Sequence, residues 1–151
     1  MLLRGETPCM AQIEIRRDAS PAFHELIDEY EASLPNDLRH GSLEPYRVAF
    51  MASVDGAPCG CVALDERDPA TGIIKRLYVR PAFRQHGIAH ALIDDLVGAA
   101  RTLGYSRIVL DTDRERLAPA YRFYLSYGFK ECAPYVEAAS YVCATFMELP
   151  L

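Results

Sequence analysis

The sequence has no long run of apolar residues. A helix that crosses a bilayer needs about 20 consecutive apolar residues, and no segment of the 151 residues approaches that length. The first residues, MLLRGETPCMAQIEIRR, also lack the apolar stretch of roughly 7–15 residues that is typical of a secretory signal. We therefore expect a cytoplasmic protein with no membrane partner.

An excess of positive charge is also missing. The formal net charge is −5, with 16 Lys and Arg against 21 Asp and Glu. Binding to nucleic acid needs Lys and Arg clustered over a broad face. We therefore expect no nucleic-acid partner.

Acidic residues are absent from one segment, between Pro69 and Ile93. The basic residues and histidines of this segment are Lys75, Arg76, Arg80, Arg84, His86 and His90. A local basic region in an acidic chain suits a small polyanionic ligand better than a long one. The alternative interpretation is a solvated basic face.

The cysteines and histidines lack the patterns of a zinc site. No pair of C-x-x-C motifs occurs, and the spacing of His86 and His90 is not accompanied by H-E-x-x-H or by an evident third ligand. Five cysteines are an odd number, and without a secretory signal we expect no disulfide scaffold. Cys59 and Cys61 are two apart, which predicts small buried side chains on one face of a strand. We expect no metal.

Strands and helices alternate along the chain. Hydrophobic periodicity predicts the order β-α-β-β-β-α-β-α-β-β. The predicted strands are 12–17, 46–54, 58–66, 73–80, 106–111, 129–132 and 143–149, and the predicted helices are 20–34, 87–103 and 118–127. The unit from Ile73 to Asp111 is expected to be a right-handed parallel crossover. The fold class is α+β, a twisted mixed sheet of about seven strands flanked by helices.

Half of the residues are hydrophobic, which is enough for one compact domain. We expect this domain to span residues 11–151. Residues 1–10 are expected to form a disordered extension, with Met10 as an alternative start to Met1.

A polar loop joins the predicted strand 73–80 to the following helix. The loop reads Arg84-Gln85-His86-Gly87-Ile88-Ala89. A helix start has unpaired N–H groups and the positive end of the helix dipole, so it is an anion site. Gly87 lets the backbone approach a phosphate, and Ala89 is too small to block it. The loop therefore predicts a pyrophosphate site, with Arg84 or Arg80 adding charge; a plain tight turn is the alternative.

These residues resemble the GNAT superfamily of acetyl-coenzyme A dependent N-acetyltransferases. Its pyrophosphate loop reads Q/R-x-x-G-x-G/A, and its Y-x-x-x-G-F element is similar to RFYLSYGF, from Arg122 to Phe129. The resemblance runs from about Gln12 onward and is strongest from Lys75 to Tyr135. It implies a GNAT-like fold, acetyl-CoA as the co-substrate without a metal, and a small-molecule or peptide amine as acceptor.

The resemblance also implies roles for individual residues. Backbone groups of a bulged strand would pair with the pantetheine arm, and one N–H there would stabilise the oxyanion. Tyr124 would protonate the leaving thiolate, because a phenol stays protonated at neutral pH. The cofactor-binding residues implied are Leu77, Tyr78, Val79, Arg84, Gln85, His86, Gly87, Ile88, Ala89 and His90. A core aromatic is the alternative for Tyr124, and structural roles are expected for Tyr121 and Tyr127.

The chain departs from the family pattern at two places. Many members carry an asparagine seven residues before the tyrosine, where this chain has Leu117. The strand 73–80 has no carboxylate to act as the general base. Glu66, Asp111, Asp113 and ordered water remain the candidates for that base.

The acceptor pocket is expected from two variable segments, Tyr30 to Glu44 and Ala133 to Cys143, with Tyr135 and Tyr141 as lining residues. Glu25, Asp28 and Glu29 are predicted on the solvated side of the first helix, and attraction of a cationic amine by this acidic face is the alternative. Cys132 and Cys143 lack the histidine that would mark an activated thiol, so we expect no acyl-enzyme.

Two other classes of function remain open from the sequence. One is a non-catalytic acyl-CoA sensor, and the other is an interaction domain whose basic loop meets an acidic partner. The protein is expected to be a monomer or a homodimer.

Overall fold

The computed structural model describes residues 12–39, 46–135 and 144–151. The predicted extension 1–10, Tyr141 and Cys143 lie outside the described residues, as do parts of both predicted acceptor segments.

The described strands form one seven-stranded sheet in the order β1-β2-β3-β4-β5-β7-β6. The strands are β1 Ile13–Arg17, β2 Val48–Val54, β3 Ala57–Asp68, β4 Thr71–Val79, β5 Arg107–Thr112, β6 Lys130–Glu131 and β7 Thr145–Pro150. Only β4 and β5 pair in parallel, and every other neighbouring pair is antiparallel. The predicted mixed sheet and the predicted order of elements are confirmed.

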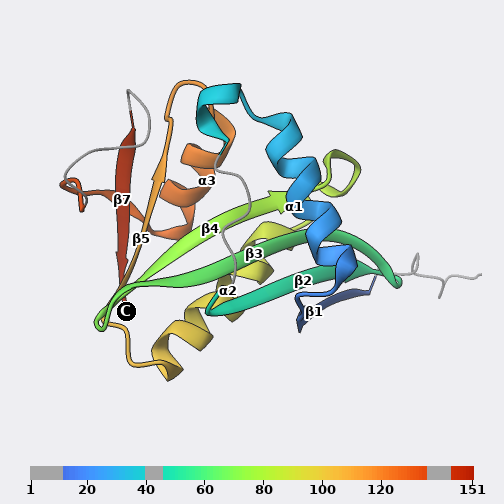
Figure 1. The fold of residues 1–151 in the computed structure, drawn as a ribbon, viewed down its shortest axis with the longest axis horizontal. Coiled ribbons are helices and arrows are strands. Elements are labelled where there is room, and N and C mark those ends of the chain that lie inside the picture. Colours follow the sequence, from blue (N-terminus) through green and yellow to red (C-terminus); the bar gives the residue numbers. More distant parts are fainter. Residues whose placement is uncertain (1–11, 40–45, 136–143) are drawn as a thin grey trace, which may run out of the picture.

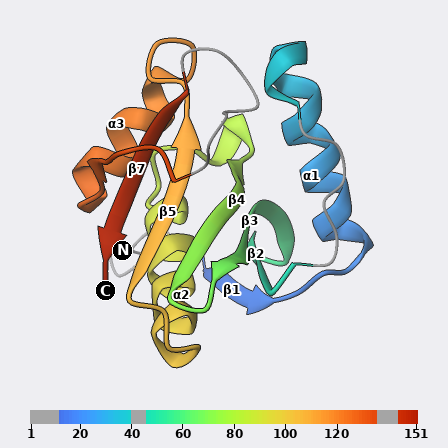
Figure 2. The same ribbon diagram turned by 60° about the vertical axis from the view of Figure 1, so that its left-hand side comes forward.

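Within the described residues, three α-helices cover the two faces of the sheet. They are α1 Pro21–Ser33, α2 Ile88–Thr102 and α3 Ala118–Tyr127, and short 3-10 turns follow α1 at Asn36–Leu38 and β4 at Pro81–Phe83. Figures 1 and 2 show α1 on one face, with α2 and α3 on the other. Two buried clusters correspond to these faces: one includes Leu92 and Leu96 of α2, and the other includes Phe23 and Leu26 of α1. The first helix therefore stands apart from the helix pair that carries the predicted motifs.

The two cysteines of β3 lie on opposite faces of the sheet, so the prediction that they share a face is wrong. Cys59 belongs to the cluster under α2, whereas Cys61 belongs to the cluster under α1. The register of β2 and β3 shifts between Ala52 and Ser53. This irregularity places an extra residue in β3 and reverses the alternation of its side chains.

The parallel pair β4 and β5 is short, and this determines where the sheet opens. Pairing extends only over Thr71–Ile73 of β4 and Arg107–Val109 of β5. Beyond Ile73, β4 continues to Val79 without β5, and the two strands diverge from their common end (Figure 1). The edge of β4 that faces this opening therefore has unpaired backbone groups.

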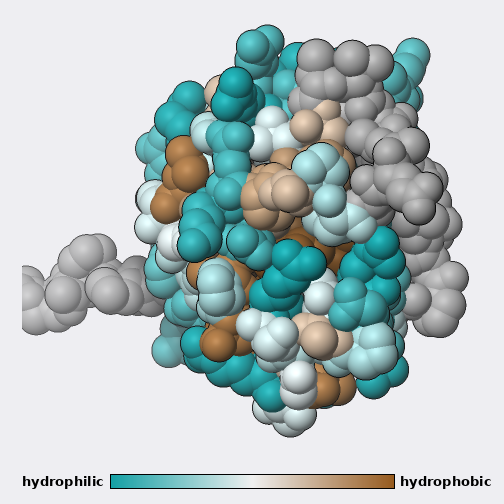
Figure 3. All heavy atoms as spheres, turned by 90° about the vertical axis from the view of Figure 1, so that its left-hand side faces the viewer, coloured by the Kyte–Doolittle hydropathy of each residue, from teal (hydrophilic) through white to brown (hydrophobic). Residues whose placement is uncertain are grey.

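The described surface is mostly polar. Hydrophilic and hydrophobic residues are intermixed on the side that carries β7 (Figure 3). Among the described residues, only Ile13 and Leu125 are large hydrophobic side chains that are exposed. None of the described helices is long and apolar enough to span a bilayer.

Candidate active site

A bulge in β4 lies next to the opening. On β3 the paired residues advance by two from Cys61 to Ala63, whereas their β4 partners advance by three, from Lys75 to Tyr78. The extra residue coincides with Arg76, whose φ of 60° is left-handed. Leu77, Tyr78 and Val79 follow the bulge, on the part of β4 that β5 does not pair. The structure thus has the bulge that the resemblance implies, at the expected strand.

The Arg76 side chain crosses to α1 and is almost fully buried. Its Nη1 donates to Oε2 of Glu31 at 2.6 Å, and the side chain is 1% exposed. Its Nε donates to the Tyr46 hydroxyl at 3.4 Å, and the backbone carbonyl accepts from the Cys61 thiol. The only sequence signal for this contact was a charged residue within a largely apolar strand.

The loop after the bulge has the geometry of an anion site. Gln85 and Gly87 have φ values of 65° and 80°, and alternating left-handed residues turn backbone N–H groups into a common concavity. The first helical hydrogen bond runs from the Ala91 N–H to the Gly87 carbonyl, which leaves the N–H groups of Ile88, Ala89 and His90 without helical partners. A Cβ at Gly87 would meet no atom within 4 Å. The space beside the Gly87 Cα is therefore open.

Side chains hold this loop to the end of β4 and to α2. Arg84 Nε donates to the Val79 carbonyl at 2.8 Å, and its guanidinium lies 5.9 Å from the centre of the Tyr78 ring. Nδ1 of His86 is 2.7 Å from the Arg84 carbonyl oxygen. His90 contacts Asp94 through Nδ1 at 3.2 Å and lies against the Tyr127 ring. Arg84 therefore remains beside the anion site.

Arg80 is directed away from the loop, toward α1. Its Nε donates to both carboxylate oxygens of Glu29, at 3.0 and 3.1 Å, and Nη1 donates to the Pro58 carbonyl. Hydrogen bonding from Arg80 lowers the pKa of Glu29. Glu29 is exposed on its helix, as predicted, and the Arg80 side chain reaches it there. Arg80 is accordingly paired with α1, whereas Arg84 lies beside the loop.

Tyr124 lies inside the molecule on α3. It is 7% exposed, with the Phe129 ring 5.5 Å away between centroids. Burial raises its pKa, and the nearby Tyr30 and Asp111 raise it further. Its hydroxyl makes no hydrogen bond to any described residue. A protonated, unengaged phenol at this position is a suitable proton donor.

Other residues of the second motif support α3. The Tyr127 hydroxyl donates to Asp94 at 2.6 Å, and the Tyr121 hydroxyl donates to Glu131. Leu117 packs against Leu34 and Leu38 instead of offering the polar group that the family pattern has there. Tyr127 and Tyr121 are thus each bonded to a neighbouring element, Tyr127 to α2 and Tyr121 to β6.

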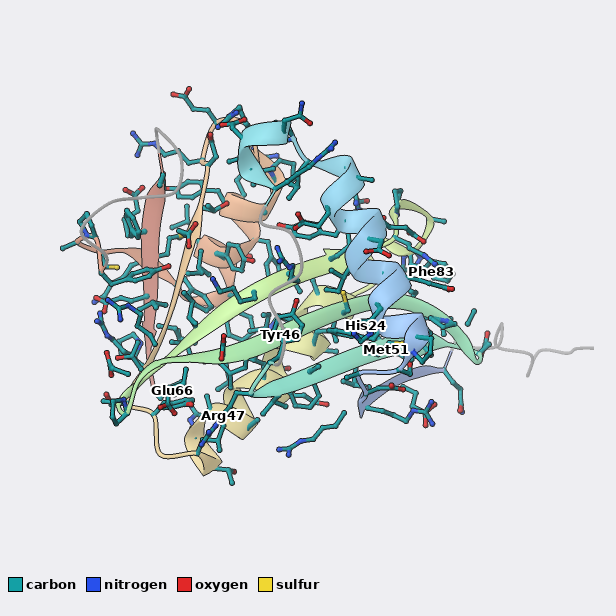
Figure 4. All side chains as sticks on the ribbon, viewed as in Figure 1. His24, Tyr46, Arg47, Met51, Glu66 and Phe83 are labelled. Atoms are coloured by element: carbon teal, nitrogen blue, oxygen red, sulfur yellow. The ribbon has the colours of Figure 1, made fainter. Side chains whose placement is uncertain are left out.

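Glu66, one of the three carboxylates considered as general base, lies far from the opening. It is paired with Gly72, which in turn pairs with Ile108 at the closed end of β4 and β5. Its carboxylate accepts from the Tyr105 hydroxyl at 2.8 Å. Figure 4 shows Glu66 with Arg47 at the opposite end of the molecule from Phe83, which follows β4.

Asp113 is occupied by the turn into α3. It is 2% exposed and accepts hydrogen bonds from the N–H groups of Glu115 and Arg116. Arg116 Nε lies 2.6 Å from its Oδ2, and the other guanidinium nitrogens bind Asp37 after α1. The Asp113 carboxylate is therefore a capping group with a fixed partner.

Asp111 is the remaining carboxylate and lies beside the opening. It follows Val109, the last β5 residue paired with β4, by two positions. Its Oδ1 accepts from the Tyr135 hydroxyl at 2.9 Å. The sequence alone did not distinguish it from Glu66 and Asp113.

Comparisons with known proteins identify the family to which this fold and site belong. The sequence profile described as "Acetyltransferase (GNAT) family" matches residues 12–129. The chain belongs to this family. The acetyltransferase is 33% identical over 127 residues to an uncharacterized N-acetyltransferase of Schizosaccharomyces pombe, over 75% of this chain and 77% of the relative. The family resemblance and the predicted acyltransferase class are thereby confirmed.

Solved structures share the fold of this acetyltransferase. A putative acyl-CoA N-acyltransferase from Klebsiella pneumoniae has a TM-score of 0.78 at 24% identity, covering 94% of this chain and 98% of the other. N-acetylglutamate synthase from Neisseria gonorrhoeae, complexed with coenzyme A and N-acetylglutamate, has a TM-score of 0.76 at 21% identity. That match covers 93% of this chain and 35% of the synthase.

Proposed function

We propose that this acetyltransferase moves an acetyl group from acetyl-CoA to a primary amine by direct attack of the amine on the thioester. The observation that carries the proposal is the opening between β4 and β5, which has the β4 bulge and the loop at Gly87 on one side. Tyr124, with its protonated hydroxyl, lies across the opening on α3.

The residues of the opening fit acetyl-CoA. The N–H groups from Gln85 to His90 are available for the pyrophosphate, and Gly87 leaves space for it. The edge of β4 after the bulge, from Leu77 to Val79, offers the pantetheine amides the hydrogen bonds of an added strand, although the Val79 carbonyl already accepts from Arg84. Acetyl-CoA supplies an activated acetyl group on a good leaving thiol.

The residues of the chain position the thioester and transfer a proton to its sulfur. A backbone N–H at the bulge stabilises negative charge on the thioester oxygen. Tyr124 donates its proton to the departing sulfur, since the free thiol has a pKa of about 8.5 and is a better leaving group when protonated.

No covalent intermediate is needed. Burial raises the pKa of the thiols of Cys59, Cys61 and Cys132, so they are weak nucleophiles at neutral pH. Cys143 lies outside the described residues. A non-catalytic acyl-CoA sensor is the alternative function, and the buried proton donor at Tyr124 favours the enzyme, because a sensor needs none.

The test is calorimetric titration with acetyl-CoA, using Gly87→Glu as the disabling variant. Gly56→Glu is a matched control, because Gly56 also has a left-handed φ, of 84°, and open space beside it. We expect Gly56→Glu to bind like the wild type and Gly87→Glu to bind at least about 10-fold more weakly, from charge repulsion with the pyrophosphate. Equal binding by both variants would contradict the loop assignment.

Thiol release with a panel of amines then separates the two functions. Release that depends on an amine supports the acetyltransferase. Tight binding of acetyl-CoA without turnover by any amine would show a sensor instead.

A further inference from the structure

The bulge in β4 changes the alternation of side chains along the strand. Ile74 packs in the cluster under α2, and Lys75 pairs with Ala63, which belongs to the cluster under α1. In a regular strand Arg76 would therefore face α2, and Leu77 would face α1. The structure has the opposite arrangement: the Arg76 side chain reaches α1, and Leu77 packs against the cluster under α2. Lys75 and Arg76 thus lie on the same face, as the extra residue of a bulge requires.

A regular strand would direct Arg76 into the apolar cluster under α2. That cluster contains Val62, which lies opposite the bulge on β3, together with Leu92 and Leu96 of α2. A guanidinium among these side chains would lose its hydration without gaining a counter-ion, which is strongly unfavourable. The charge of Arg76 therefore favours the bulged register over the regular one.

On the α1 face the same side chain has a counter-ion. Nη1 of Arg76 donates to Oε2 of Glu31 at 2.6 Å, and the two side chains are 1% and 15% exposed. Nε donates to the Tyr46 hydroxyl at 3.4 Å, and the Cys61 thiol donates to the Arg76 carbonyl at 3.5 Å. Contacts from three separate segments therefore hold Arg76 at its left-handed φ of 60°. A strained residue persists only when its surroundings fix it in this way.

The register after the bulge decides which N–H groups face the opening. The Arg80 N–H donates to the Cys59 carbonyl of β3 at 2.8 Å. Because successive N–H groups of a strand point to alternate edges, the N–H of Tyr78 also faces β3. The N–H groups of Leu77 and Val79 then face the other edge, which β5 leaves unpaired. A slip of one residue would exchange these two sets.

We infer that Arg76, paired with Glu31, fixes the register of β4 and thereby directs the N–H groups of Leu77 and Val79 toward the acetyl donor. Arg76 is a positioning residue, because its side chain is buried against α1 and acts through the backbone that follows it. The catalytic consequence rests on the proposed function, whereas the register can be measured without any substrate.

Arg76→Met and Arg76→Lys separate charge from bulk, because the new side chains are both unbranched and differ in charge. Methionine fits an apolar cluster, so the regular register becomes accessible, whereas lysine keeps the charge that excludes it. Turnover is measured with an amine that the wild type acetylates. We expect kcat to fall by about 10–100-fold in Arg76→Met, from misplacement of the N–H groups at the thioester. Arg76→Lys should keep most of the wild-type kcat.

Amide hydrogen exchange reports the register directly when NMR follows single residues of the ligand-free protein. In the wild type we expect slow exchange at Tyr78, whose N–H faces β3, and faster exchange at Val79. In Arg76→Met this contrast should disappear or reverse, and Arg76→Lys should retain it. A residue that only stabilised the fold would instead change the exchange of the strand amides together.

Glu31→Gln and Glu29→Gln form a matched pair, because both carboxylates lie on α1 and bind an arginine of β4 or its end. Glu31→Gln should lower kcat, though less than Arg76→Met, since the buried guanidinium loses its counter-ion but keeps its charge. Glu29→Gln should leave kcat and the exchange pattern unchanged. Its partner Arg80 follows the strand and has an ordinary φ of −55°.

The outcomes separate this inference from the proposed function. A wild-type exchange pattern in Arg76→Met overturns the inference, whatever happens to kcat, and leaves the acetyltransferase intact. Equal losses of kcat in Arg76→Met and Arg76→Lys would also overturn it, because charge would then not select the register. If Arg76→Met does not fold, wild-type kcat in Glu31→Gln overturns the inference. If no amine is turned over, the proposed function fails, and the exchange pattern still decides whether Arg76 fixes the register.

Discussion

At the scale of one residue, burial keeps the phenol of Tyr124 protonated. Its phenol is 7% exposed, and burial is the first cause of its raised pKa. Tyr105 is also buried and has a raised pKa of about 12, but its hydroxyl is bonded to Glu66 at the closed end of the sheet. The two tyrosines therefore differ in position, and only the hydroxyl of Tyr105 has a hydrogen-bond partner among the described residues.

Tyr124→Phe removes the proposed proton donor with little change in packing. We expect kcat to fall by about 10²-fold or more, as is usual for loss of general-acid catalysis, with the affinity for acetyl-CoA nearly unchanged. Steady-state kinetics with an amine that the wild type acetylates measure kcat, and calorimetry measures the affinity for acetyl-CoA. Tyr105→Phe is the matched control and should keep kcat. An unchanged rate in Tyr124→Phe would exclude this residue from the reaction.

At the scale of elements, ion pairs connect α1 to the strands and turns that build the site. Glu29 and Glu31 of α1 bind Arg80 and Arg76 on either side of the β4 residues that line the opening. A left-handed residue other than glycine costs roughly 1–3 kcal/mol, and the contacts of Arg76 to α1 oppose that cost. Helix α1 therefore helps to hold the bulge on which the acetyl donor is proposed to bind.

Arg116 makes a similar connection between the turn after α1 and the turn before α3. Its hydrogen bonds lower the pKa of Asp37 and Asp113 below their usual 3.8. Carboxyls with lowered pKa values stabilise the fold above their usual pKa, and this stabilisation is lost as the pH falls through the lowered values. The folded state should therefore depend on Arg116 at neutral pH but much less in acid.

Arg116→Met tests this connection by urea unfolding at several pH values. We expect a lower free energy of unfolding than in the wild type at pH 7, and a difference that shrinks as the pH falls below about 3.8. Arg122→Met is the control, because Arg122 is exposed on α3 and has no ion pair with a described residue. A difference that is constant with pH would exclude the ion pairs as its cause.

At the scale of the whole molecule, the opening between β4 and β5 is a gap in an otherwise continuous sheet. A ligand that binds there adds hydrogen bonds to both the strand edge and the loop at Gly87. Any ligand that binds only the folded state raises stability by mass action, by about 2.7 kcal/mol at 100 times its Kd. Acetyl-CoA should therefore raise the free energy of unfolding of the whole domain.

We expect acetyl-CoA at that concentration to raise Tm by roughly 5–10 °C, given about 2–4 °C per kcal/mol for a chain of this size. Differential scanning fluorimetry measures the shift. Gly87→Glu should show a much smaller shift than Gly56→Glu under the same conditions. No shift in the wild type would contradict binding in the opening and would favour an interaction domain.

The order of elements, the loop at Gly87 and the motif around Tyr124 were all predictable from the sequence. These features depend on residues that are neighbours along the chain: apolar periodicity, a proline that ends a strand, and a glycine at a helix start. Local patterns of this kind predict the same element regardless of how distant segments pack.

The tertiary structure alone decided which charges meet and which faces the side chains occupy. Arg80 was a candidate for phosphate until α1 placed Glu29 beside it, and the bulge in β3 separated Cys59 from Cys61. Asp111 became distinct from Glu66 only because β4 and β5 part after Ile73. Strand register and ion pairs join residues that are distant in sequence, so no local pattern encodes them. The sequence therefore determined the fold family and the loop proposed to bind the acetyl donor, and the packing of α1 against the opened sheet determined which charges pair beside that opening.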